Sequence, residues 1–364
     1  MNRAIKYRLY PSEKQKTMFA KTFGCCRKVY NLMLEDKKKY YEEHHKMLLT
    51  TPAQYKKDYP YLKEVDSLAL ANEQLHLQTA YKNFFRDKKV GFPRFKSKHG
   101  RKSYTTNNQK GTIALFDHAI KLPKIGKVKA KIHRRPREAW KLKSATISQN
   151  SDGKFYVSVL FEYNAEMIAV PKSEHAIGLD YKSDGLYMDS YGKVASGHKF
   201  YRESQKKLAK AQRKLRKKKI GSKNYEKQKV RVARIYKHTA NQRLDYLHKL
   251  STEIANQYDV VCVENLNIKA MSNKKFGNGK ATLDNGYGMF LSMLEYKLSE
   301  RGKYLVKVGK WYPSSQICSC CGKRQKLTLS DRMYQCSCGF MADRDYNAAQ
   351  NICKEGLRLL REAS

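Results

Sequence analysis

The hydrophobic pattern of the N-terminal half predicts a helical segment inserted into a β-rich one. The opening KYRLYP alternates like a strand and stops at Pro11, after which Ser12 is placed to cap a helix. Helical spacing of apolar residues then continues, with loops, before the chain changes to short β-like runs separated by Gly, Pro and Asn. We therefore expect a helical insert within a β element in this half of the chain, with the β texture resuming from Gly91 to about Tyr163.

The C-terminal half alternates strands with helices. Two short apolar strands, Ala176–Tyr181 and Asp259–Glu264, each carry a carboxylate at their end, and a further strand is predicted at Tyr304–Val308. A helical pattern rich in cations covers Tyr201–Lys219, and a loop rich in Gly, Asn and Lys covers Met271–Asn285. The whole chain therefore reads as a multidomain protein, α/β in this half and β with a helical insert in the other.

Charge identifies the class of partner. The 364 residues contain 75 Lys and Arg against 33 Asp and Glu, a net charge of +42, while hydrophobic residues still make up 41% of the chain. Such a surplus spread along a folding chain is typical of a protein that binds nucleic acid, whereas an anionic membrane would explain only local charge runs. No apolar stretch is long enough to cross a bilayer and the first residues have no hydrophobic signal core, so we expect a cytoplasmic protein without a membrane partner.

Two segments are candidates for direct nucleic-acid contact. The cations of the helix at 201–219 surround a narrow apolar stripe and would repel one another without a polyanion, although a solvated charged helix is the plainer interpretation. The segment GFPRFKSK interleaves aromatic residues with cations, which suits base stacking and phosphate contact but also an ordinary basic loop. The candidate residues are Arg94, Lys96, Lys206, Lys210, Arg213 and Lys217.

Three acidic residues are candidates for a metal-dependent active site. Asp180 and Glu264 end apolar strands, and Asp345 begins the last helix, so the three carboxylates can meet if the strands are neighbours. Clustered carboxylates persist with bound cations, and their hard oxygens favour Mg²⁺ or Mn²⁺. A pair of such ions supports phosphodiester hydrolysis. The alternative for each residue is a turn or a helix cap, and Asp343 could take the place of Asp345.

A short segment rich in cysteine predicts a zinc site. Five of the nine cysteines lie between Cys318 and Cys338, in two groups that are each followed by Gly. We prefer Cys318, Cys321, Cys336 and Cys338 as four thiolate ligands of a structural Zn²⁺. Cys320 is the spare thiol, and the sequence also allows it to replace Cys318 or Cys321. The remaining cysteines are expected to be packed thiols; they are Cys25, Cys26, Cys262 and Cys353.

The ordered set of motifs resembles the TnpB (OrfB) proteins of bacterial insertion sequences, which are similar to the compact type V CRISPR effectors. The motifs are GLDY, VCVENLNI, the paired cysteine groups and DRDYNAAQNI, together with KYRLYPSEKQK, AYKNFF, GFPRFKSK, IKLPKIGKVK and NQRLDYLHKLS, and they cover nearly the whole chain. The resemblance implies a wedge-like β-barrel domain, formed by residues 1–10 and 91–172, and a helical recognition insert, formed by residues 11–90. It also implies a RuvC-like nuclease domain of RNase H fold, formed by residues 173–316 and 341–364, with a zinc ribbon inserted at 317–340.

The same resemblance implies an activity. TnpB proteins use a guide RNA from the transposon end to pair with target DNA beside a short adjacent motif, and they cleave double-stranded DNA at one magnesium-dependent site. The family's three RuvC carboxylates fall on Asp180, Glu264 and Asp345, with Asp343 as the fallback for the last. We therefore expect an endonuclease involved in transposition and DNA recombination, a monomer within a ribonucleoprotein.

Polar residues of the helical insert are the candidates for reading the adjacent motif, namely Ser67, Asn72, Gln74 and Gln78. Two other functions stay open at this point. One is an RNA-guided DNA-binding repressor that does not cleave, against which the three acids argue. The other is a transposase that joins strands itself, although the sequence shows no Tyr or Ser nucleophile motif.

Overall fold

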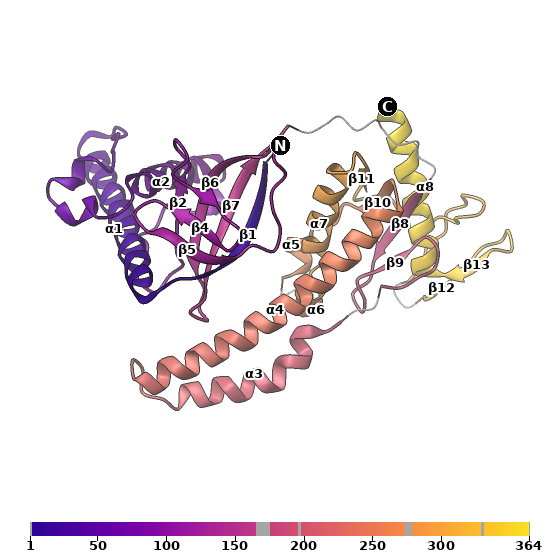
Figure 1. Ribbon diagram of the computed structural model, residues 1–364. Helices are drawn as coiled ribbons and strands as arrows, with labels where there is room; N and C mark the ends of the chain where they lie inside the picture. Colours follow the sequence, from indigo (N-terminus) through magenta and orange to yellow (C-terminus); the bar gives the residue numbers. More distant parts are fainter. Residues whose placement is uncertain (1, 165–174, 196–197, 274–278, 329–330, 364) are drawn as a thin grey trace. The chain divides into compact units, whose positions relative to one another are not determined.

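The structure is a computed structural model that describes residues 2–164, 175–195, 198–273, 279–328 and 331–363. The chain divides into two compact units, Met1–Ala165 and Glu166–Ser364 (Figure 1). Each unit has its own sheet and its own hydrophobic core. The two units are therefore described separately.

A seven-stranded antiparallel sheet forms the base of the first unit. Its strand order is β2-β6-β7-β1-β5-β4-β3, so the N-terminal strand β1 (Asn2–Tyr10) lies between β7 (Phe155–Glu162) and β5 (Gly126–Lys131). Side chains of β1 and β7 alternate between buried and accessible, which is the period expected for a sheet with one packed face. The other strands are β2 (Lys102–Asn107), β3 (Ala114–Leu115), β4 (Ala119–Leu122) and β6 (Lys141–Gln149).

Two helices pack against this sheet. Ser12 begins α1 (Glu13–His44) with a capping box, in which its hydroxyl accepts from the backbone of Gln15 while the Gln15 side chain accepts from the Ser12 backbone. Asp66 caps α2 (Ser67–Arg86) by accepting from the backbone of Leu68. Three short 3₁₀ turns flank α2, at Gln54–Lys56, Pro60–Lys63 and Lys88–Val90.

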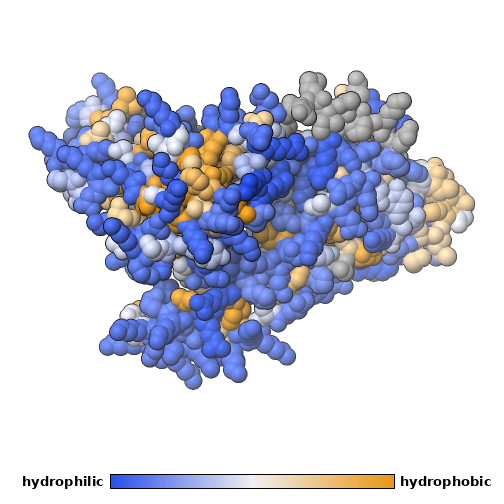
Figure 2. Space-filling model, viewed as in Figure 1, coloured by the Kyte–Doolittle hydropathy of each residue, from blue (hydrophilic) through white to orange (hydrophobic). Residues whose placement is uncertain are grey.

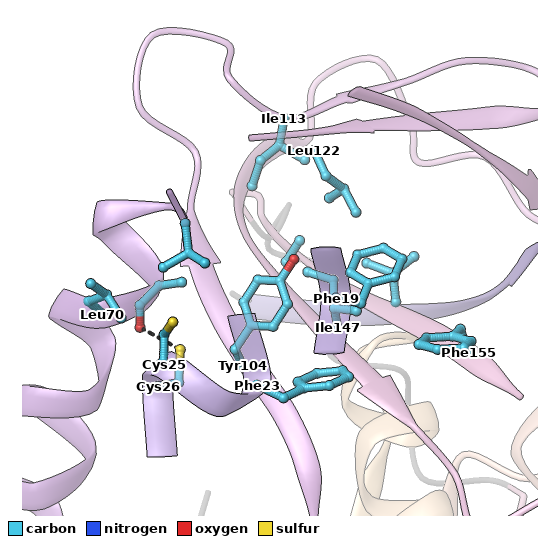
Figure 3. Packing of buried hydrophobic residues seen from close by; sticks show 14 of the residues in the cluster. Phe19, Phe23, Cys25, Cys26, Leu70, Tyr104, Ile113, Leu122, Ile147 and Phe155 are labelled. Atoms are coloured by element: carbon cyan, nitrogen blue, oxygen red, sulfur yellow. Dashed lines mark hydrogen bonds between the residues drawn. The ribbon is translucent and has the colours of Figure 1, made fainter. Parts of the chain in front are cut away.

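Aromatic residues fill the core between the helices and the sheet (Figure 3). The ring of Phe19 lies 5.5 Å from that of Phe155, and the ring of Phe23 lies 5.7 Å from that of Tyr104. Cys26 donates a hydrogen bond from its thiol to the carbonyl of Ala69, which joins α1 to α2. The helical segment therefore shares one core with the β strands that surround it in the sequence.

The second unit is built on a four-stranded mixed sheet of order β11-β10-β8-β9. The strands β8 (Ala176–Tyr181), β10 (Val260–Glu264) and β11 (Tyr304–Val308) are parallel, and β9 (Tyr187–Asp189) is antiparallel to β8. Because β8 and β10 are parallel neighbours, their carboxyl ends lie at the same edge of the sheet.

The C-terminal helix α8 (Arg344–Ala363) packs directly on this sheet through two glycines. A side chain at Gly178 of β8 would collide with the backbone of Ala349 and Cys353 in α8. A side chain at Gly356 of α8 would collide with Cys262 of β10. The backbones of strand and helix can approach this closely only because both positions lack a Cβ atom.

A helical hairpin extends from the second unit (Figure 1). It consists of α3 (Phe200–Arg216) and α4 (Lys223–Gln257), and Figure 2 shows hydrophilic residues over most of its visible surface. Leu208 and Ala211 of α3 pack on Val232 of α4, so the apolar stripe holds the hairpin together and the cations face outward. The remaining elements are α5 (Ile268–Met271), α6 (Gly279–Asn285), α7 (Tyr287–Ser299), β12 (Met333–Gln335) and β13 (Met341–Asp343).

The structure differs from the sequence predictions at two places. The sequence pattern did not reveal β2 and β6, whose polar residues lack a clear alternation of apolar positions. The loop predicted at Met271–Asn285 was wrong in its last part, since Gly279–Asn285 forms α6, while residues 274–278 lie outside the described residues. None of the helices in the described ranges has the length and apolar character required to cross a bilayer.

Candidate functional site

Three acidic side chains from separate elements approach one another in the second unit. Asp180 is the next-to-last residue of β8, Glu264 ends β10, and Asp345 lies in the first turn of α8. The pKa of Asp180 is raised well above its ordinary value by burial and by the nearby charges of Glu264 and Asp345. The parallel strands and the close contact at Gly178 therefore place these three residues near enough for Glu264 and Asp345 to affect the pKa of Asp180.

Glu264 is held in place by the loop that follows β11. The Ser314 hydroxyl donates a hydrogen bond of 2.7 Å to Oε1 of Glu264. The side-chain amide of Asn351 in α8 donates in turn to the carbonyl of Ser314, at 2.8 Å. Burial raises the pKa of Glu264, and the hydrogen bond from Ser314 partly opposes that shift. The orientation of this acid is thus set by β11 and α8 as well as by its own strand.

Asp343 and Asp345 have different environments, although one residue separates them. Asp343 accepts hydrogen bonds from the backbone N–H groups of Asp345 and Tyr346, at 2.8 and 3.2 Å, and so caps the start of α8. Asp345 lies near Asp180 and accepts from the Nζ of Lys182, at 2.7 Å. The geometry thus favours Asp345 over Asp343 as the third member of the acidic group.

A buried tyrosine next to these acids has an unfilled hydrogen bond. Tyr287, the first residue of α7, is 1% exposed, and its hydroxyl is one of few buried side-chain polar atoms in the described part of the chain without a hydrogen-bond partner. Its ring packs 4.8 Å from that of Tyr181. The pKa of Tyr287 is raised by burial and then by the charges of Asp180 and Glu264.

The donor set fits a hard divalent cation. Three carboxylates of like charge repel one another unless a cation lies among them, and oxygen ligands are those that Mg²⁺ and Mn²⁺ prefer. The orphaned hydroxyl of Tyr287 also fits a site whose water or ion shell would supply its missing partner. Asp180, Glu264 and Asp345 could supply such oxygens, but among the described residues their ligand atoms do not all lie within 4.8 Å of one another, so their side chains would have to turn toward a shared ion.

The second candidate site is a cluster of four cysteine thiols. The Sγ atoms of Cys318, Cys321, Cys336 and Cys338 all lie within 4.8 Å of one another, and they form the only group of this kind among the described residues. The closest pairs are Cys318 with Cys338 at 3.7 Å and Cys321 with Cys336 at 3.6 Å. The structure thus brings together the four thiols that the sequence favoured, and the exposed Cys320 stays outside the cluster.

Local backbone geometry produces this cluster. Gly322 and Gly339 follow the two cysteine groups with φ values of 77° and 85°, in the left-handed region that glycine adopts without strain. The nearby backbone N–H of Cys338 lowers the pKa of the Cys336 thiol to about 6, which favours the thiolate form that binds metal. Four such ligands in one closed group could hold a structural metal such as zinc.

Two buried asparagines attach the cysteine cluster to α8. Asn347 accepts from the backbone N–H of Ser319, at 2.9 Å, and donates to the carbonyl of Ile317, at 2.7 Å. Asn351 donates to the same carbonyl, at 2.6 Å. The helix that carries Asp345 therefore also positions the first cysteine group.

The basic residues predicted for nucleic-acid contact fall into two kinds. Lys206, Lys210 and Arg213 are exposed on α3 and Lys217 is exposed directly after its end, and within the described ranges none of the four forms a salt bridge. Lys96 is different, because its Nζ pairs with Glu73, a carboxylate that is 1% exposed, and lies 4.2 Å from the ring centre of Tyr30. Lys96 therefore joins its segment to the helices of the first unit, whereas Arg94 is exposed.

The polar candidates on α2 also differ in accessibility. Asn72 is 7% exposed and donates to the carbonyl of Leu68 on its own helix, at 2.8 Å, so it faces the packed side. Ser67 accepts from the Nζ of Lys56, at 3.0 Å, on the exposed surface. Gln74 and Gln78 are partly exposed.

Several contributing residues were not predicted from the sequence. Lys182, Tyr287 and Ser314 surround the acidic group, yet none of them is part of a recognisable spacing pattern. The repeated Asn in the YNAAQN stretch, four residues apart on a helix, could have indicated that Asn347 and Asn351 share a face.

Known protein families match three parts of the chain. They are described as "Helix-turn-helix domain" at residues 1–46, "Probable transposase" at 158–275 and "Cas12f1-like, TNB domain" at 287–352. Residues 2–46 of the first match form the strand β1 and one long helix, α1. They do not form the two short helices that the description "Helix-turn-helix" names. The second match contains Asp180 and Glu264, and the third contains Asp345 and the four clustered cysteines.

Two curated relatives extend along almost the whole chain. A protein of Streptomyces pristinaespiralis named "Putative RNA-guided DNA endonuclease" is 34% identical, with 100% of this chain and 94% of the relative covered. The protein "Putative RNA-guided DNA endonuclease InsQ" of Escherichia coli is 31% identical, with 98% and 93% covered. Shorter matches of 32% identity, over 38% of this chain, include the mimivirus "TnpB-like protein L79".

A solved structure shares the fold. The Cas12f1 chain from a cryo-EM structure of a Cas12f1-sgRNA-target DNA complex aligns with a TM-score of 0.63, at 13% sequence identity, with 97% of this chain and 98% of that chain covered. The fold of both units is therefore of the general TnpB and Cas12 type. With full-length relatives above 30% identity, this chain belongs to the TnpB (OrfB) family of transposon-encoded RNA-guided DNA endonucleases.

Proposed function

We propose that this protein is an RNA-guided endonuclease of an insertion sequence, which cleaves double-stranded DNA by metal-dependent hydrolysis. The observation that carries the proposal is geometric: β8 and β10 are parallel neighbours that carry Asp180 and Glu264 at their carboxyl ends, and Asp345 at the start of α8 bonds to Lys182, two residues after Asp180. The names of the full-length relatives support the reaction class. The net charge of +42 supports the class of partner.

In this proposal the three carboxylates are the catalytic residues and the magnesium ligands. Bound magnesium or manganese ions would activate water and stabilise the leaving oxygen of the phosphodiester. Ser314 orients Glu264, and the contact of α8 with β8 fixes Asp345 near Asp180. The sheet of β8 to β11 with α8 would then be the RuvC-like domain of RNase H type, formed by residues 173–316 and 341–364.

The nucleic acids are assigned to the remaining parts. The guide RNA would lie along the exposed cations of α3 and its C-terminal cap, namely Lys206, Lys210, Arg213 and Lys217. Base pairing would supply the sequence specificity, so the protein needs to read only a short adjacent motif. Residues 1–10 and 91–172 would act as the wedge-like domain, and residues 11–90 would act as the recognition insert. Ser67, Gln74 and Gln78 are accessible candidates for that reading, along with Arg94.

Zinc would have a structural role at residues 317–340. Four cysteine ligands fill a tetrahedral coordination shell and leave no position for substrate. Because Asn347 and Asn351 attach the cysteine cluster to α8, loss of the metal would also disturb the helix that carries Asp345. The zinc site would thus contribute to cleavage through positioning.

Cleavage of a plasmid programmed by a matching guide RNA tests the proposal. Replacing Asp180, Glu264 or Asp345 by Ala should abolish cutting while leaving guide RNA binding intact. Asp184→Ala is the matched control, because Asp184 is an exposed acid close to Asp180 in sequence that pairs with Lys199 outside the acidic group. Cutting that survives Asp180→Ala together with Glu264→Ala would reject the catalytic assignment.

The same experiment separates the alternative functions. A repressor would bind the programmed plasmid and leave it uncut in the wild-type protein. A strand-transfer transposase, the activity suggested by the description "Probable transposase", would join labelled transposon ends to a target. Sequencing the RNA that copurifies should yield one species from the transposon end, and random cellular fragments would contradict the guided mechanism.

A further inference from the structure

A lysine ammonium group already lies within the acidic group. Lys182 follows Asp180 by two residues, and its Nζ lies 2.7 Å from Oδ2 of Asp345, 163 residues further along the chain. The two side chains are 28% and 20% exposed, so this contact is partly shielded from water. It is a direct ion pair between the end of β8 and the start of α8.

Residues on both sides of Lys182 contact α6. The Tyr181 hydroxyl shares a hydrogen bond of 3.1 Å with the hydroxyl of Thr282. The side-chain amide of Asn285 donates to the carbonyl of Ser183, at 2.9 Å. A shift of the loop that carries Lys182 would break these contacts, whereas rotation of the Lys182 side chain would not.

Asp345 cannot serve a divalent cation and the ammonium equally well. Magnesium binds carboxylate oxygens at about 2.0–2.1 Å, so an ion on Asp345 would lie close to the Lys182 ammonium. Two cations at that separation repel each other. Either the lysine side chain turns away or the ion is bound more weakly.

We infer that Lys182 is an internal counter-cation of the acidic group and competes with the divalent ion for Asp345. The inference rests on the proposed function, since it assumes that the three carboxylates hold the ion. It assigns Lys182 as a positioning residue that sets the metal concentration at which the site fills. A lysine that merely stabilised the fold would not change metal affinity in this direction.

Binding of Mn²⁺ to the full-length protein tests the inference, measured by electron paramagnetic resonance after the cysteine cluster has been loaded with one equivalent of zinc. Lys182→Met should bind Mn²⁺ about tenfold more tightly than the wild-type protein, because one nearby positive charge is lost. Lys182→Arg keeps the charge and should remain within about threefold of wild type. Lys199→Gln is the control, since Lys199 forms an ion pair of the same 2.7 Å length with Asp184 outside the acidic group.

The possible results have separate meanings. Unchanged or weaker Mn²⁺ binding by Lys182→Met, confirmed with Lys182→Gln and with melting curves that show folded protein, overturns the role of Lys182. An equal gain in Lys199→Gln also overturns it, because a general loss of charge would then explain the effect. Binding that persists in Asp180→Asn and Glu264→Gln contradicts the carboxylate site itself, and with it the proposed function.

Discussion

Ser314 and Glu264, which are 50 residues apart in the chain, are joined by a hydrogen bond of 2.7 Å from the serine hydroxyl to the glutamate carboxylate. The serine belongs to the loop between β11 and the first cysteine group. This contact links the edge of the sheet to the segment that leads into the cysteine cluster. It also fixes one of the three acids in a single orientation.

Ser314→Ala should therefore reduce cleavage without removing a metal ligand. Loss of an outer hydrogen bond of this kind costs about 10- to 100-fold in activity or metal affinity. The rate of programmed plasmid cleavage at several magnesium concentrations measures the effect. Ser319→Ala is a useful comparison, since Ser319 bonds to Gln350 and does not contact an acid. Equal losses in both variants would show that the loop, and not the bond to Glu264, is responsible.

Asp180→Asn should make the protein more stable at neutral pH when divalent ions are chelated. The folded-state pKa of Asp180 is raised, so its contribution to stability is fully present below the pKa of the unfolded chain and is lost as pH rises through the folded pKa. Asparagine does not ionise, so the variant does not lose this stability as pH rises. Its melting temperature at pH 7 should therefore exceed that of the wild-type protein by about 3 °C or more. The difference from wild type should disappear near pH 4. A variant that melts lower at both pH values would contradict the crowding of charge around Asp180.

Tyr287→Phe tests the orphaned hydroxyl. Without divalent ions the substitution removes a buried polar atom that lacks a partner, so the free energy of unfolding should rise by about 1 kcal/mol. With excess magnesium that gain should shrink, because the wild-type hydroxyl then finds a partner in the water shell of the site. Thermal melts with chelator and with magnesium provide the comparison. The same gain under both conditions would mean that the hydroxyl faces no ligand.

Cys336→Ser should release the metal from the cysteine cluster, whereas Cys320→Ser should retain it. Cys336 is one of the four thiols within 4.8 Å, and Cys320 is exposed outside them. The zinc content of the purified proteins decides the matter, with about one equivalent expected in the Cys320 variant. Cleavage should fall in the Cys336 variant alone. Loss of zinc from the Cys320 variant would make Cys320 a zinc ligand, contrary to the geometry of the cluster.

Lys96→Met should reduce stability more than it reduces RNA binding. The substitution leaves the buried carboxylate of Glu73 without its main partner, at a cost of about 1–3 kcal/mol in unfolding free energy. Adding Glu73→Met should recover most of the loss, because an apolar pair can replace a buried ion pair. Chemical denaturation measures both variants. Arg94→Met is the control, and its effect should appear in RNA binding and not in stability.

The sequence predicted the elements that have strong periodicity or charge. The strands around Asp180 and Glu264 are apolar runs with clear ends, and the long basic hairpin has an amphipathic pattern, so both were predictable. The strands β2 and β6 were not, because they are rich in Lys, Ser and Thr, so residue type alone does not show which of their positions face the core. The helix α6 was obscured by the glycine and asparagine residues around it.

The residues of the candidate site also divide into those that the sequence suggested and those that it did not. Acids at strand ends and paired cysteines can be recognised from residue type and spacing alone. Lys182, Ser314 and Tyr287 could not be recognised, because their importance arises from contacts between segments that are distant in sequence. For Lys96 the residue type suggested an open cation, and only the three-dimensional structure reveals its buried partner Glu73.

The glycine at position 178 has a consequence for how the acidic group can respond to its ligands. Because β8 and α8 touch there through main-chain atoms, no rotamer change can widen or narrow the space between them. The Cα atoms of Asp180 and Asp345 are therefore held at a distance that only a movement of the backbone could change. Adaptation to a bound ion or to a phosphodiester must come from rotation of their own short side chains, so the site tolerates little variation in the size of what it holds.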